Sequence, residues 1–120
     1  MIKTMEGTMR RLPVKRADGS IDLIELEAIF YLEARQGDTL IRTKRKKPYR
    51  SVQRLKELAQ KLPGPAFVRC HREYIVNLNR VRALTPRSSR DWDLRLDPPV
   101  NRRIPIGRDR LEKIHKILGL

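Results

Sequence analysis

The stretch "FVRCHREYIVN", residues 67–77, places four polar side chains inside the most apolar run of the chain. A strand would alternate apolar and polar residues, and a helix would repeat its apolar residues every three or four positions. This stretch follows neither period cleanly. We expect Phe67 and Val68 to be buried at one end and residues 74–76 at the other, so that the polar patch between them is held outward.

Such a patch meets the needs of base reading in nucleic acids. Arginine is the commonest reader, because its guanidinium can bond both O6 and N7 of guanine. A strand whose polar residues simply face solvent fits the same pattern equally well. The stretch by itself therefore leaves both interpretations open.

The length and composition predict one small domain. The chain has 120 residues, of which 39% are hydrophobic and only 5% aromatic, so its core must be built mainly from Ile, Leu and Val. Residues 1–10 carry little pattern and are predicted to be a flexible tail. Residues 11–120 contain no repeat and no domain boundary, and we expect them to form one domain.

The charge is strongly one-sided. The chain has 28 Lys and Arg against 14 Asp and Glu, a net charge of +14, which favours a polyanionic partner. A single cysteine excludes an internal disulfide and argues against a Cys-based zinc site. No stretch approaches the roughly 20 apolar residues of a membrane span, and the N-terminus lacks an apolar signal core. We therefore expect a cytoplasmic protein with no membrane contact.

Strand signals outnumber helix signals along the chain. A hairpin is expected around Asp18 and Gly19, followed by strands over 28–34 and from 39 onward, with a turn at 35–38. Further strands are expected at 92–96 and 103–106. These signals predict a mainly β fold of antiparallel strands.

Two short helices complete the expected secondary structure. Ser51 could cap a helix that runs to about Leu62, because apolar residues recur there at helical spacing and "PGP" follows. A closing amphipathic helix is expected from Leu111 onward, with Ile114 and Ile117 on its apolar face.

No constellation of residues for catalysis is visible. His71 and His115 lie on separate segments, and Glu25 and Glu27 are best interpreted as solvated carboxylates. Cys70 and His71 are neighbours in an expected strand, so their side chains would point to opposite faces. There is no glycine-rich phosphate loop. We therefore predict no enzyme, no metal, no cofactor and no small-molecule substrate.

The run "RTKRKKPYR", residues 42–50, has six cations in nine residues and no acid. Lysines mostly meet phosphates, so this run predicts contact with a nucleic-acid backbone rather than sequence recognition. A solvated loop is the plain alternative. The candidates for phosphate contact are Arg42, Lys44, Arg45, Lys46, Lys47, Arg87, Arg90, Arg110 and Lys113.

Residues 67–77 resemble the signature of the LytTR DNA-binding family of bacterial transcription regulators. That pattern runs Phe, any residue, Arg, apolar, His, Arg, Ser, aromatic, Ile or Val, Val, Asn, and Glu73 is its one departure here, an acid that would repel a phosphate. "AIFYLEARQGDTLIRT", "SVQRLKELAQKLPGPAF" and "RIPIGRDRLEKI" are similar to other family segments, with Gly107 in place of a usual Ser. The resemblance covers about residues 10–119.

The resemblance implies short antiparallel strands in small stacked sheets, with two short α-helices. It also implies double-stranded DNA as the partner, with loops rather than a recognition helix entering successive major grooves. His71 and Asn77 are implied to be structural, with His71 fixing Arg72 through nearby backbone, and Cys70 is expected in the core. The implied base-contact candidates are Arg72, Arg108, Arg35, Gln36 and Asp38.

Several alternatives stay open. A general basic RNA-binding or ribosome-associated domain would show exposed aromatic residues for base stacking, and only Trp92 and three scattered tyrosines could serve. A protein-interaction module with a basic surface would bind without regard to base sequence. Self-association on paired DNA sites is also left open. The family joins this domain to a receiver domain or a membrane segment, so a stand-alone regulator and an excised response-regulator output domain are both compatible with the sequence.

Overall fold

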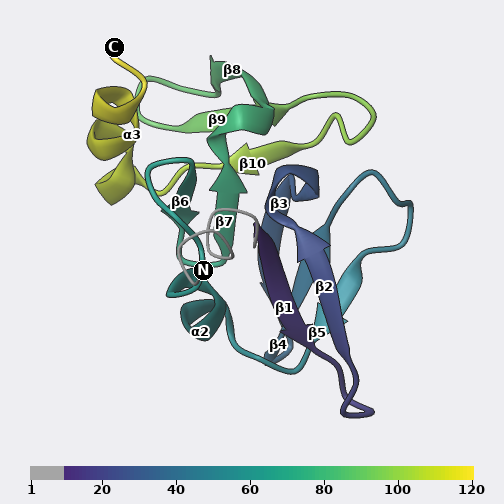
Figure 1. Ribbon diagram of the computed structural model, residues 1–120. Helices are drawn as coiled ribbons and strands as arrows, with labels where there is room; N and C mark the ends of the chain where they lie inside the picture. The colour runs from purple at the N-terminus through teal and green to yellow at the C-terminus, as the bar shows by residue number, and fades with distance from the viewer. Residues whose placement is uncertain (1–9) are drawn as a thin grey trace, which may run out of the picture.

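A five-stranded antiparallel sheet forms the middle of the molecule, in the computed structural model, which describes residues 10–120 (Figure 1). The predicted tail lies almost wholly outside the described residues. The strand order is β5-β4-β3-β7-β6. The strands are β3 (Tyr31–Arg35), β4 (Asp38–Arg42), β5 (Tyr49–Ser51), β6 (Phe67–His71) and β7 (Tyr74–Asn77).

Two smaller sheets and two helices pack around this central sheet. The first small sheet is the hairpin expected around Asp18 and Gly19, and the second is a three-stranded sheet of order β10-β9-β8. These strands are β1 (Arg11–Lys15), β2 (Ile21–Glu25), β8 (Val81–Pro86), β9 (Trp92–Leu96) and β10 (Arg103–Pro105). The helices are α2 (Leu55–Ala59) and α3 (Leu111–Ile117), with 3-10 turns η1 (Leu26–Ala28), η2 (Leu78–Arg80) and η3 (Arg108–Arg110).

The segment 67–77 is a hairpin whose second strand is buried on both faces. Every residue of β7 is buried, and successive side chains enter different cores. Tyr74 and Val76 pack toward the β8–β10 sheet and α3, whereas Ile75 packs toward the β1–β2 hairpin and α2. This explains the apolar run of β7, because a strand covered on both sides has no solvent face for polar residues. Strand β6 does alternate, with Val68 and Cys70 buried and Arg69 and His71 half-buried.

Each face of the central sheet therefore has its own core. One core combines Phe30 and the β6–β7 hairpin with Leu94, Ile104 and Ile114 from the β8–β10 sheet and α3. The other joins the β1–β2 hairpin and α2 to β3 and β4. The predicted fold, mainly β with small stacked sheets and two short helices, is confirmed.

The expected helix from Ser51 to Leu62 is wrong in extent. Ser51 lies in β5 and is fully buried, and its hydroxyl donates to the carbonyl of Lys15 at 3.0 Å and accepts from the amide of Gln53 at 3.0 Å. The hydroxyl thus joins β5 to β1 and caps no helix. Helix α2 begins only after Arg54, whose amide donates to the Glu57 carboxylate at 3.0 Å. No helix within residues 10–120 is long and apolar enough to cross a membrane.

Candidate nucleic-acid interface

The turn between β3 and β4 is the first of the predicted contact loops. Gln36 and Gly37 both have positive φ, at 52° and 87°, which suits the twist of a two-residue hairpin and favours glycine at the second position. Gln36 is exposed at the tip. Arg35 pairs with Glu33 of the same strand at 3.5 Å, and Asp38 accepts from Arg50 of the neighbouring β5 at 3.1 Å, so both flanking candidates carry ion pairs.

The turn between β6 and β7 presents Arg72 and Glu73, both exposed. Its backbone is held from within the hairpin. The Glu73 amide donates to Nδ1 of His71 at 3.1 Å, and the Arg69 guanidinium donates to the carbonyls of His71 and Arg72. The His71 ring also packs edge-on against Tyr74. The side chain of Arg72 therefore extends from a fixed backbone.

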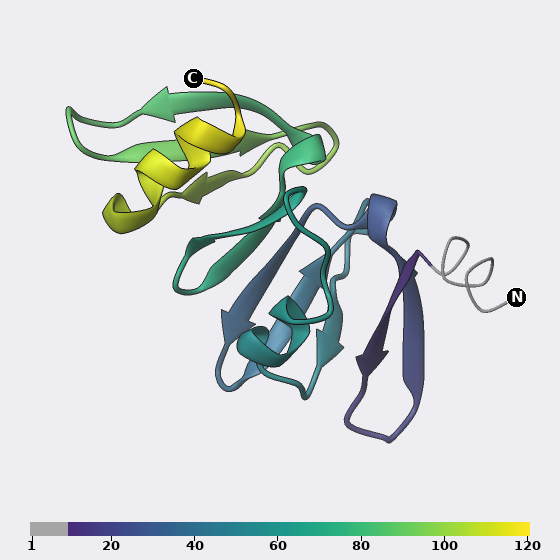
Figure 2. The same ribbon diagram turned by 60° about the vertical axis from the view of Figure 1, so that its left-hand side comes forward.

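Backbone hydrogen bonds join the loops into one row. The Ala34 amide donates to the Glu73 carbonyl at 2.9 Å, which ties the β6–β7 turn to β3 just before its own turn. On the other side of the hairpin, the Gly107 amide donates to the Cys70 carbonyl at 2.8 Å. These turns and the segment entering α3 consequently lie along the same side of the molecule (Figure 2). Gly107, which precedes Arg108, is anchored by this bond.

Arg108 is held by a carboxylate from a fourth loop. Its Nε donates to Oδ1 of Asp91 at 2.8 Å, and its Nη2 donates to Oδ2 at 3.1 Å. Asp91 ends the turn between β8 and β9, where it also accepts from the Ser88 hydroxyl at 3.2 Å. The hydrogen bond from Arg108 holds the pKa of Asp91 at about 2, so the pair is ionised at neutral pH.

Two of the predicted phosphate contacts, Arg110 and Arg87, bond other groups of the protein. Arg110 is half-buried, and its Nη1 donates to the Arg69 carbonyl at 3.0 Å, which places it among the supports of the β6–β7 hairpin. Arg87 bonds the buried Asp93 at 2.9 Å. Asn77, predicted to be structural, is buried and donates to the Ile29 carbonyl at 3.0 Å.

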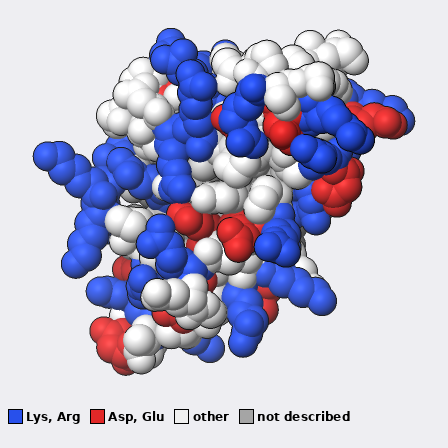
Figure 3. Space-filling model, turned by 180° about the vertical axis from the view of Figure 1, so that it is seen from behind, with Lys and Arg blue, Asp and Glu red and all other residues white. Residues whose placement is uncertain are grey.

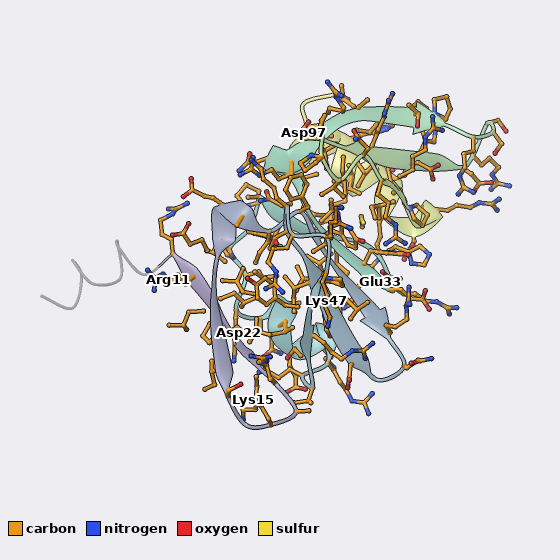
Figure 4. The ribbon with its side chains drawn as sticks, turned by 90° about the vertical axis from the view of Figure 1, so that its right-hand side faces the viewer. Arg11, Lys15, Asp22, Glu33, Lys47 and Asp97 are labelled. Atoms are coloured by element: carbon orange, nitrogen blue, oxygen red, sulfur yellow. The ribbon has the colours of Figure 1, made fainter. Side chains whose placement is uncertain are left out.

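The other cations of the predicted set are more open. In the loop between β4 and β5, Arg45 stacks over the ring of Tyr49, the first residue of β5, at 4.0 Å. Arg42, at the end of β4, donates to the Thr43 carbonyl. Figure 4 places Lys47 from this loop in the middle of its view. Figure 3 shows Lys and Arg spread over the face seen from behind, with acidic side chains among them in the middle, at the upper right and along the lower edge. The exposed members without an ion pair in the described part of the chain are Lys44, Arg45, Lys46, Lys47, Arg90 and Lys113.

Cys70 and His115, the residues of possible catalytic interest, pack against other side chains of the protein. Cys70 is fully buried, and burial raises the pKa of its thiol to about 12, so it is a core residue. His115 packs edge-on against Trp92, with ring centroids 5.8 Å apart. Over residues 10–120, no cluster of His, Cys, Asp and Glu has the arrangement of a metal site.

Sequence reasoning missed several residues at this surface. Asp91 gave no local signal, because its partner Arg108 is 17 residues away. The hydrogen bonds from Arg69 to the β6–β7 turn could not be predicted either, since nothing in the sequence indicates that an arginine in a strand bonds the carbonyls of the next turn. Three exposed arginines of the β8–β10 sheet were also passed over, although Arg95 occupies a polar position of the alternating "WDLRL".

The comparisons with known proteins agree with this architecture. The LytTr DNA-binding domain family matches residues 19–119. The chain is 30% identical over 103 residues to the Transcriptional regulatory protein YpdB of Escherichia coli K12, covering 86% of this chain and 41% of that protein. It is 28% identical over 117 residues to the Sensory transduction protein LytT of Bacillus cereus, covering 98% of this chain and 45% of that protein. It thus spans less than half the length of these relatives.

A solved structure has the same fold. It is the LytTr DNA-binding domain of a Bacillus cereus protein described as a methyl-accepting/DNA response regulator. The two structures superpose with a TM-score of 0.78 at 26% identity, covering 92% of this chain and 98% of that one. With the family match over most of the chain, this likeness shows that the chain belongs to the LytTR family of DNA-binding domains.

Proposed function

We propose that this domain binds duplex DNA in a sequence-specific manner within a transcription regulator, using its row of loops in successive major grooves. The observation that carries the proposal is the joining of separate loops by the hydrogen bonds of Ala34 and Gly107, with Arg72 and Arg108 on that row. The names of the relatives, a transcriptional regulatory protein and a sensory transduction protein, support the regulatory role.

The pairing of Arg108 with Asp91 is compatible with base reading. A guanidinium has five N–H donors, and Asp91 takes Nε and one hydrogen of Nη2. The remaining hydrogens of Nη1 and Nη2 form the end-on pair that fits O6 and N7 of guanine. Asp91 therefore acts as a support that orients the reader, and Arg108 approaches the base with its rotamer already restricted.

Arg72 is held through its backbone and not through its side chain. Its carbonyl is bonded by Arg69, whereas its own guanidinium makes no ion pair among the described residues. The neighbouring Glu73 contributes through its backbone, which bonds His71 and Ala34. Its carboxylate disfavours a phosphate at this tip, so the turn suits a base edge better than the sugar–phosphate backbone.

RNA binding by base stacking is less well supported. Trp92 is half-buried against His115, Tyr31 and Tyr74 are buried, and Tyr49 is half-buried beneath Arg45. No fully exposed aromatic ring is left in residues 10–120 to form a stacking platform. A duplex read by arginines at loop tips agrees better with this surface.

The test is selection of bound duplexes from a random pool, followed by binding profiles of Arg72→Ala and Arg108→Ala against single-base variants of the selected site. Each variant should lose about 1–3 kcal/mol of discrimination at one or two base pairs, because its bidentate hydrogen bonds to guanine are removed. Lys44→Ala is the matched control and should weaken all sites alike. Equal binding of selected and random duplexes by the wild type would overturn the proposal, and uniform losses in both arginine variants would remove the base-reading assignment.

A further inference from the structure

Three arginines form a row across the outer face of the β8–β10 sheet. Arg95 of β9 pairs in register with Arg103 of β10. On the other side, Ala83 of β8 pairs with Arg95, and a register shift between Val81 and Ala83 inserts Arg82 next to that pair. Adjacent strands lie about 4.8 Å apart, so the row spans roughly 10 Å. We call these three residues the arginine row.

The arginine row works against the stability of the sheet. Like charges placed directly opposite on neighbouring strands are destabilising, yet Arg95 and Arg103 occupy such a pair. All three side chains are exposed. Within residues 10–120, none of them makes an ion pair or a side-chain hydrogen bond, and the one acid nearby on β9, Asp93, is taken by Arg87. An unsatisfied row of this kind fits a polyanion that binds from outside.

The arginine row is connected to the loops that carry Arg108. The strands β8 and β9 that bear Arg82 and Arg95 are joined by the turn that ends in Asp91, the support of Arg108. Arg95 is four residues beyond Asp91, so the two residues are about 14 Å apart along the strand. On the duplex, the same length corresponds to about four base-pair steps of 3.4 Å. Helix α3 covers the opposite face of this sheet, and in Figure 4 the strands of the sheet lie in front of this helix.

We propose that the arginine row binds the sugar–phosphate backbone of the duplex beside the bases read by the loops. This inference rests on the proposed DNA-binding function and adds a second contact surface to it. A guanidinium bonds phosphate oxygens well, and such contacts position the protein without selecting sequence. The row spans roughly 10 Å, a length over which about three phosphates follow one another at 3.4 Å of rise along one DNA strand.

The test measures affinity for the selected duplex against salt concentration, in the full chain. In the variant Arg82→Gln/Arg95→Gln/Arg103→Gln, the magnitude of the log–log slope should fall by roughly 0.9 for each phosphate that the row no longer neutralises, up to about 2.7 for all three. The decrease in affinity should be the same for all single-base variants of the site. The melting temperature should equal or exceed that of the wild type, because the Arg95–Arg103 repulsion is removed.

Two matched variants make the result specific. Arg11→Gln/Lys56→Gln/Lys61→Gln removes the same charge from exposed positions of β1, α2 and the segment after α2, and should leave the slope near its wild-type value. Replacing the arginine row by lysines should keep most of the slope. If the glutamine variant of the row keeps the same salt slope as the Arg11→Gln/Lys56→Gln/Lys61→Gln control, the row does not bind phosphates of the duplex. Provided that the wild type still selects its site, only this inference is then overturned. A wild type that selects no sequence overturns the proposed function instead.

Discussion

Arg108 and Asp91 form a two-bond ion pair on the loop row, and its ionisation can be followed by pH. The Arg108 hydrogen bond lowers the pKa of Asp91 from 3.8 to about 2. A lowered carboxyl pKa stabilises the folded state above the unfolded value, and this contribution is lost as pH falls from about 4 to about 2. Arg108→Gln should raise the Asp91 midpoint toward 3.8, as read from its side-chain carboxyl carbon by NMR. Asp18, whose pKa is lowered by Ser20, is the internal control and should not move.

An unchanged Asp91 midpoint in Arg108→Gln would show that the two side chains do not pair in solution. The orienting role of Asp91 would then be lost, although Arg108 could still reach a base. Asp91→Asn offers the complementary measurement, since it keeps the shape of the side chain and removes its charge. Its expected effect is weaker discrimination at the base pair read by Arg108, with the Arg72 position unaffected.

Cys70 gives a second prediction for a single residue. The thiol is fully buried, and burial raises its pKa to about 12, so at about pH 8 it is both covered and protonated. Iodoacetamide should leave the native protein unlabelled and should modify one thiol for each chain after denaturation in urea. Rapid labelling under native conditions would contradict the packing of β6 against α3. The denatured sample serves as its own positive control.

At the scale of the elements, one network of polar side chains connects the β8–β10 sheet to the central sheet. Arg102, in the loop between β9 and β10, donates to the Tyr31 hydroxyl at 2.6 Å, to Glu33 at 3.1 Å and to the Tyr74 hydroxyl at 2.9 Å. Burial raises the pKa of Tyr74, which keeps its hydroxyl protonated and able to donate to Glu33 at 3.3 Å. The network therefore ties a loop of one sheet to β3 and β7 of the other.

Arg102→Met should cost about 1–3 kcal/mol of unfolding free energy, because the buried Glu33 and two hydroxyl groups lose a shared partner. The measurement is urea unfolding, with the m-value unchanged. Arg103→Met is the matched control, since the adjacent Arg103 is exposed and unpaired within the described chain, and its stability should stay within about 0.5 kcal/mol of wild type. Equal stability of the two variants would mean that the network contributes nothing to the connection between the two sheets.

For the whole molecule, the charge of +14 should dominate affinity and its dependence on salt. The variant Lys44→Gln/Lys46→Gln/Lys47→Gln removes three exposed cations from the loop between β4 and β5. It should weaken binding to every sequence alike and flatten the salt slope, because lysines meet phosphates. Binding isotherms at several salt concentrations, on selected and mismatched duplexes, check this. A change in base preference with an unaltered slope would contradict it.

The sequence by itself determined the fold class and the family resemblance, because both depend on local or compositional features. The Asp18–Gly19 hairpin and the closing helix follow from turn chemistry and apolar spacing. The signature at 67–77 marked the hairpin that carries the candidate base reader Arg72, and the excess of cations pointed to a polyanion. These properties are visible without a fold, since neighbouring residues carry them.

Only the tertiary structure decided which side chains are available to a partner. Ser51 looked like a helix cap until its burial between β5 and β1 gave its hydroxyl other partners. Arg108 and Arg110 stand two residues apart, yet one faces Asp91 and the other bonds the Arg69 carbonyl 41 residues away. Arg108 and Arg110 carry the same charge, so the sequence alone does not distinguish their roles. The role of each arginine depends on whether the folded chain brings an acceptor within about 3 Å of its guanidinium nitrogens. That distance is set by packing between strands that are remote in sequence.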